Sequence, residues 1–176
     1  TSDDPTPYSY WGTAWGYPDS NASGNSTNMY DFVFVQPNQY NFGYRNYQGT
    51  SSYRAIVEIE GAISSTNVSN YNYLGEYQGH HYFESTFTDS WWDHANRIND
   101  QEFAAYGDNA YLYIPNSFEE HNVWLEPKIG QSTWYWIGIY KNPRYNSSYQ
   151  EGWTDVKGNL LQSTGSAAPE YMTTIP

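Results

Sequence analysis

Apolar and polar residues alternate along several short stretches of the chain, and this pattern predicts a structure rich in β-strands. The clearest alternation lies in residues 53–60. One face of that strand would be apolar and the other mainly polar, so we expect it to be half buried. Its apolar face is formed by Tyr53, Ala55, Val57 and Ile59. Apolar runs in residues 31–35 and 134–140 predict two further strands.

A β-hairpin is predicted between residues 71 and 85. Two runs of strand-forming residues, 71–77 and 80–85, flank the pair Gln78-Gly79, and glycine readily takes the positive φ that tight hairpin turns require. The pattern also predicts a short strand over residues 111–114. Residues 1–30 and 141–176 are rich in turn-forming residues and are expected to be mostly loop.

Two helices are predicted in the second half of the chain. The first begins near Asp89 and ends near Gly107, and its apolar stripe is expected to contain Trp92, Ala95 and Ile98. The second begins at a capping box, in which Ser117 caps the helix and Glu120 stands three residues later. These helices and the predicted strands indicate an α+β fold with small antiparallel sheets and long loops.

Composition narrows the classes of function. Aromatic residues make up 20% of the chain, including 20 Tyr and 8 Trp, so rings must fill much of the core. The net charge of −12 disfavours nucleic acid and anionic membranes as partners, because both attract clustered positive charge. The absence of cysteine excludes disulfides and thiol catalysis. No apolar run is long enough to span a membrane, so no membrane insertion is expected.

No catalytic motif stands out. The four histidines are not spaced as zinc ligands, and His80 and His81 would point to opposite faces of one strand. Glu119 and Glu120 could suggest a glycosidase carboxylate pair, but the capping box accounts for Glu120 and solvent exposure accounts for Glu119. We therefore predict that the chain is not an enzyme and carries no cofactor.

The order of these elements resembles a C-type lectin-like domain whose halves are exchanged. Residues 71–176 resemble its N-terminal half, with Trp92-Asp93-His94-Ala95 on the first helix, Leu112 to Glu120 before the second, and Trp136-Ile137-Gly138-Ile139 as the most recognisable strand. Residues 1–62 resemble its C-terminal half, with a long loop around Trp15 to Asn21, a strand at 31–35 and a closing strand at 53–61. Residues 63–70 form the linker.

This resemblance implies two possible arrangements. The first and last strands of the fold pair, so a linker of about ten residues could join them in a circularly permuted monomer. Alternatively, each half is completed by a neighbouring copy, which gives a head-to-tail contact that grows into a filament. We favour assembly, and we expect an extracellular adhesion or surface-fibre assembly module. The alternatives are a calcium-independent lectin and a display module for protein targets.

The resemblance also bears on ligand binding. Sugar-binding members of the family hold Ca²⁺ beside a loop proline, but here Tyr17 precedes Pro18, Tyr30 stands at the later glutamate position, and Arg45-Asn46 replaces an Asn-Asp pair. We therefore expect no calcium at that site and no other metal. A sugar could still stack on the aromatic loop. The candidate ligand-binding residues are Trp11, Trp15, Tyr17, Asp19 and Tyr30.

Four Asn-x-Ser/Thr sequons are candidate glycosylation sites of a glycoprotein. They begin at Asn21, Asn25, Asn67 and Asn146. Their number is what chance placement of the Asn, Ser and Thr residues would give. The sequons therefore permit an extracellular or cell-surface location without establishing it.

Overall fold

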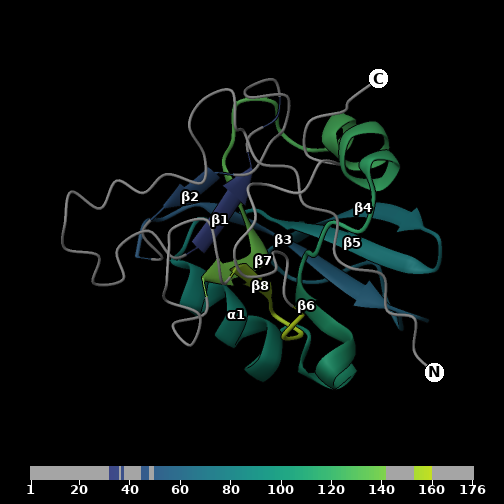
Figure 1. The fold of residues 1–176 in the computed structure, drawn as a ribbon. Coiled ribbons are helices and arrows are strands. Elements are labelled where there is room, and N and C mark those ends of the chain that lie inside the picture. The colour runs from purple at the N-terminus through teal and green to yellow at the C-terminus, as the bar shows by residue number, and fades with distance from the viewer. Residues whose placement is uncertain (1–31, 36, 38–44, 48–49, 142–152, 160–176) are drawn as a thin grey trace, which may run out of the picture.

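One mixed sheet organises the part of the chain that the structure describes (Figure 1). The computed structural model describes residues 32–35, 37, 45–47, 50–141 and 153–159. The strands along the sheet are, in order, β2 (Arg45–Tyr47), β1 (Phe32–Val35), β7 (Tyr135–Lys141), β3 (Arg54–Glu60), β5 (His80–Ser85) and β4 (Tyr71–Tyr77). Two short strands lie off this path, β6 (Ala110–Leu112) beside β3 and β8 (Trp153–Asp155) beside β7. The predicted α+β class is confirmed.

The helical segments cover both faces of the sheet (Figure 1). On one face, α1 (Trp91–Asp100) and the 3₁₀ segment η3 (Ala104–Asn109) border a cluster that contains Trp91, Ile98 and Phe103. On the other face, the π-helix η4 (Glu119–Leu125) and the 3₁₀ turn η5 (Glu126–Lys128) border a second cluster around Leu125. None of the described helices is long and apolar enough to span a membrane.

Aromatic rings fill the core, as the composition predicted. Of the eight largest fully buried side chains among the described residues, all but Ile56 are aromatic. Many of these rings meet at tilted or edge-to-face angles, such as Phe83 against Phe103 with centroids 5.3 Å apart. Such pairs stabilise a core by about 0.5–1.5 kcal/mol each beyond the burial of their area. The scarcity of aliphatic residues is thus compensated by ring packing.

The prediction that β3 is half buried was wrong. All five residues from Ala55 to Ile59 are buried, because clusters of apolar residues cover both faces of the sheet. Ile56 contributes to the cluster beside η4, whereas Val57 contributes to the cluster beside α1. This double burial takes Glu58 out of solvent completely.

The hairpin is confirmed, and it fixes the place of the connection from residue 61 to residue 70. β4 and β5 pair from Tyr71↔Ser85 to Tyr77↔His80, and both turn residues have positive φ, 51° at Gln78 and 85° at Gly79. β3 pairs with β5, the second strand of this hairpin. The resemblance had implied that β3 would pair with β4, the first strand of residues 71–176. β3 and β4 therefore run parallel, and the connection returns along the hairpin from one end to the other.

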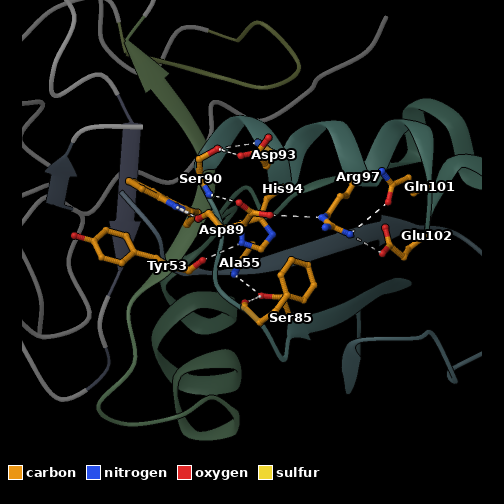
Figure 2. A network of polar contacts seen from close by, with 12 residues as sticks. Tyr53, Ala55, Ser85, Asp89, Ser90, Asp93, His94, Arg97, Gln101 and Glu102 are labelled. Atoms are coloured by element: carbon orange, nitrogen blue, oxygen red, sulfur yellow. Dashed lines mark hydrogen bonds and ion pairs between the residues drawn. The ribbon is translucent and has the colours of Figure 1, made fainter. Parts of the chain in front are cut away.

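Polar contacts anchor α1 to the start of β3 (Figure 2). Ser90 caps the helix by accepting a hydrogen bond from the Asp93 N–H at 3.1 Å. The buried His94 donates from Nε2 to the Tyr53 carbonyl at 2.9 Å, and burial lowers the pKa of His94, which keeps the ring neutral. The helix thus holds the strand at whose centre Glu58 lies.

The predicted apolar stripe of this helix is confirmed at Ile98 and Ala95, which belong to or pack against the core, and is wrong at Trp92. Trp92 is 55% exposed, whereas Trp91 is buried and donates from Nε1 to the Ile137 carbonyl at 2.9 Å. The α-helix also ends at Asp100, earlier than predicted, and the chain continues into η3. A buried indole N–H needs an acceptor, and the Ile137 carbonyl of β7 provides one for Trp91.

Gly138 in β7 allows a close approach that no other residue would permit. A Cβ at this position would lie 2.1 Å from the Leu112 carbonyl oxygen, and the Gly138 N–H donates to the Tyr113 carbonyl at 2.7 Å. We predict that Gly138→Ala lowers the free energy of unfolding by about 3 kcal/mol, the upper range for overpacking. Urea denaturation of variant and wild type measures the loss.

Gly79→Ala is the matched control for this prediction. Its φ of 85° strains any side chain, but nothing lies within 4 Å of an added Cβ. Its free energy of unfolding should therefore fall by only about 1 kcal/mol, the cost of placing alanine in the left-handed region of backbone conformation. Equal losses in the two variants would contradict the steric explanation for Gly138.

Candidate functional site

A buried carboxylate and a histidine form the centre of the candidate site. Glu58 on β3 has 0% exposure, and its Oε1 lies 2.5 Å from Nδ1 of His80 on β5. Its other oxygen accepts a hydrogen bond from the Ile114 N–H at 3.1 Å. Because the carboxylate is an acceptor, Nδ1 of His80 carries the proton and Nε2 is the outer nitrogen. The bond to Glu58 raises the pKa of His80.

A second buried carboxylate comes from η4, which covers the face of the sheet to which Glu58 points. Glu120 in η4 is 3% exposed and accepts hydrogen bonds from the Tyr82 hydroxyl and from the Asn116 N–H. Burial, and then the charge of Glu58, raise the pKa of Glu120 to about 7. Two carboxylates thus share a region from which water is largely excluded, and their repulsion is offset by Tyr82, Asn116 and His80.

The predicted capping box is confirmed in one of its two bonds. Ser117 Oγ accepts from the Glu120 N–H at 3.1 Å. The Glu120 carboxylate, however, bonds to the N–H of Asn116 at 2.6 Å instead of that of Ser117. The remaining oxygen can therefore reach Tyr82 on the sheet. Glu119 is exposed, as expected.

These groups border a cleft of about 470 Å³. We call it the 78–157 cleft, after two of the residues that line it. Its wall is formed by Glu60, Tyr77, Gln78, His80, Tyr82, Tyr111, Ile114, Asn116, Ser117, Glu120, Asp155, Lys157 and Asn159. Polar groups and tyrosines dominate this wall, and Ile114 is the only aliphatic residue among its described members. Its size lies within the usual range for small-molecule sites.

A cation lies at one side of the 78–157 cleft. Lys157 donates to Glu60, and its Nζ lies 4.3 Å from the centre of the Tyr111 ring. Tyr111 also donates to Glu60, at 2.7 Å. Although burial acts to raise it, the bonds from Lys157 and Tyr111 hold the pKa of Glu60 below its usual 4.5. The tight turn that presents Lys157 is closed by Asp155, which accepts from the Lys157 N–H at 2.9 Å.

The binding residues predicted from the sequence are not among the residues that the structure describes. Trp11, Trp15, Tyr17, Asp19 and Tyr30 are outside the described residues, as are Asn21, Asn25 and Asn146. Asn67 is described, and it is exposed on the connection between β3 and β4, where a glycan would find room. Among the described residues no three His, Asp or Glu side chains are grouped as a metal site requires. His80 and His81 diverge as predicted, toward Glu58 and toward the Tyr73 hydroxyl.

Sequence reasoning missed the 78–157 cleft, although one signal for it existed. Ile56 lies between Arg54 and Glu58 on the face of β3 that was expected to be polar. An aliphatic residue on that face indicates that it is covered, which would require a partner for Glu58. His80, in the adjacent strand, supplies that partner. The approach of Glu120 has no comparable signal, because it depends on the position of η4.

Comparison with known proteins adds no identification. No family model, no curated protein and no solved structure matches this chain.

The pKa of Glu120 predicts a particular dependence of stability on pH. Between pH 4.5 and about 7 the folded chain keeps a proton on Glu120 that the unfolded chain has released. Stability therefore falls as pH rises through this range. Glu120→Gln cannot lose that proton, so the variant should gain on the order of 3 kcal/mol relative to wild type between pH ~4.5 and ~8.

Urea denaturation at several pH values measures this difference, and other titrating groups cancel in the comparison. His80, whose raised pKa has the same sign, and His94, whose lowered pKa has the opposite sign, are present in both proteins. Glu119→Gln, in the same turn but exposed, is the control and should follow the wild-type curve. Parallel curves for Glu120→Gln and wild type would show that Glu120 does not titrate in this range.

Proposed function

We propose that the chain is an extracellular, non-catalytic adhesion module with a C-type lectin-like fold. The observation that carries this proposal is the use of its histidines. All four are hydrogen-bonded to another element, His80 to Glu58, His81 to Tyr73, His94 to Tyr53 and His121 to Tyr113. Groups that often act as general bases in enzymes hold strands and helices together here.

The pairing of the two segments supports the C-type lectin-like fold. β1, β2 and β3 come from residues 1–62, and the other strands come from residues 71–176, yet all belong to one sheet. β3, the proposed closing strand, pairs with β5 from Ile56↔Glu84 to Glu60↔His80. The strand with the Trp-Ile-Gly-Ile motif, β7, lies between β1 and β3. The direct pairing of β3 with the first strand, β4, that the resemblance implied is replaced by pairing through β5, so the support for an exchanged order lies in the single sheet that both segments share.

The same pairing favours adhesion by a monomer over assembly of a fibre. In the structure β3 completes the sheet within its own chain. A fibre would require the identical pairing between copies, which must compete with a partner already tethered by a short connection. Tethering raises the effective concentration of the internal partner to the millimolar range, so the internal pairing wins at ordinary protein concentrations.

Light scattering over a wide concentration range tests this choice. We expect one species near 20.4 kDa at all concentrations. Large particles of varied length that persist on dilution would instead show that copies complete one another, and fibre assembly would then be the function.

Binding tests the adhesion proposal itself. The fluorescently labelled chain, applied to glycan and protein arrays with and without a chelator, should be retained by at least one ligand class in both conditions. Mass spectrometry of the retained ligands should show no chemical change. A monomer that neither array retains, or one that cleaves its ligand, would contradict a non-catalytic adhesion module.

A further inference from the structure

The charged side chains that line the described part of the 78–157 cleft already have partners: Lys157 and His80 are each paired with a glutamate, and Glu120 and Asp155 accept hydrogen bonds from neutral N–H or O–H groups. Lys157 is paired with Glu60, and His80 is paired with Glu58. A charged ligand would have to separate one of these pairs, and removing a partner from a buried charge is expensive. A neutral ligand can use the spare lone pairs and hydrogens of each pair without separating it.

Hydrogen-bonding capacity remains unused around this cleft. The hydrogen bond of the His80 ring within the described residues is made by Nδ1 to Glu58, and none of these residues binds Nε2. The Ser117 hydroxyl accepts from Glu120 and still has its own hydrogen to donate, and the side-chain amide of Gln78 lies on the exposed turn. These groups mix donors and acceptors, as does each hydroxyl of a sugar.

The rest of the wall also suits a sugar. Tyr77, Tyr82 and Tyr111 offer rings with polar tips, and aromatic residues of this kind combine an apolar surface with a hydrogen-bonding group. Among the described residues of the wall Ile114 alone offers an aliphatic surface, so a lipid chain or an apolar peptide would gain little burial against them.

We propose that the 78–157 cleft binds a neutral oligosaccharide without a metal ion. The proposal rests on the proposed function and assigns it a ligand class and a site. Its described wall is built from β3, the hairpin turn, the segment before η4 and the turn after β8, whereas the aromatic loop around Trp15 that the sequence suggested is outside the described residues.

The first experiment identifies the ligand class. The chain is applied, in the presence of EDTA, to an array of neutral, sialylated and sulfated oligosaccharides. We expect retention by neutral members and weaker retention by the acidic ones. Preference for acidic glycans, or no retention by any glycan, would overturn the proposal. Retention on a protein array would in that case leave the adhesion proposal standing.

The second experiment locates the site, with the best neutral oligosaccharide titrated by calorimetry. Lys157→Met keeps the stem of the side chain and removes its ammonium group, and Gln78→Gly removes an amide while keeping the positive φ of the turn. Each variant should weaken binding about tenfold, the effect of losing one good hydrogen bond. Thermal melting of each variant establishes that it is folded.

Matched controls separate this cleft from the rest of the surface. Lys128→Met makes the same change at an exposed lysine whose Nζ lies 4.8 Å from the Trp124 ring, outside the cleft, and should bind as wild type. Trp15→Ala should also bind as wild type. Loss of binding in Trp15→Ala with full binding in the two cleft variants would assign the sugar to the aromatic loop and overturn the proposal.

Discussion

The carboxylate of Glu58 in the middle of the central strand is the constraint on which the rest of the structure depends. A fully buried charge is tolerated only where partners surround it, and Glu58 finds them in His80 and in the Ile114 N–H. These two bonds fix the register of β5 against β3 and the course of the chain beyond β6. Removing one partner would leave the charge unpaired, at a cost of about 3–5 kcal/mol. The arrangement of β3, β5 and the segment after β6 therefore cannot change without a large loss of stability.

Tyrosine explains how a chain with few aliphatic residues can hold such polar groups inside. Tyr82 and Tyr135 are both fully buried, yet each donates its hydroxyl to a carboxylate, Glu120 and Glu84. Burial raises the pKa of both tyrosines, so they remain neutral donors. Each ring therefore contributes apolar area to the core while its tip satisfies an acid. Phenylalanine would supply the area alone and leave the acid without a donor.

The sequence was a good guide to local structure and a poor guide to the site. Alternation and turn chemistry were sufficient for the 71–85 hairpin, because pairing and turn lie within a few residues of one another. They failed at the start of α1, where Trp91 and Trp92 are equally apolar in sequence and it is Trp91 that packs inward and donates to the carbonyl of Ile137. They failed again for Glu58 and Glu120, whose approach depends on elements about 60 residues apart in sequence. The residues predicted to bind a ligand lie outside the part of the chain that the structure describes.

The hydrogen bonds of the buried acids also position the wall of the 78–157 cleft. Glu120 turns toward the sheet because its carboxylate bonds to Asn116 and Tyr82, and this places the start of η4 opposite the hairpin turn. His80 is held by Glu58 so that one nitrogen faces inward and the other belongs to the wall of the cleft. A cleft whose wall is fixed from behind loses little side-chain entropy when a ligand binds. The same bonds that make the fold specific therefore preorganise the surface that we assign to the ligand.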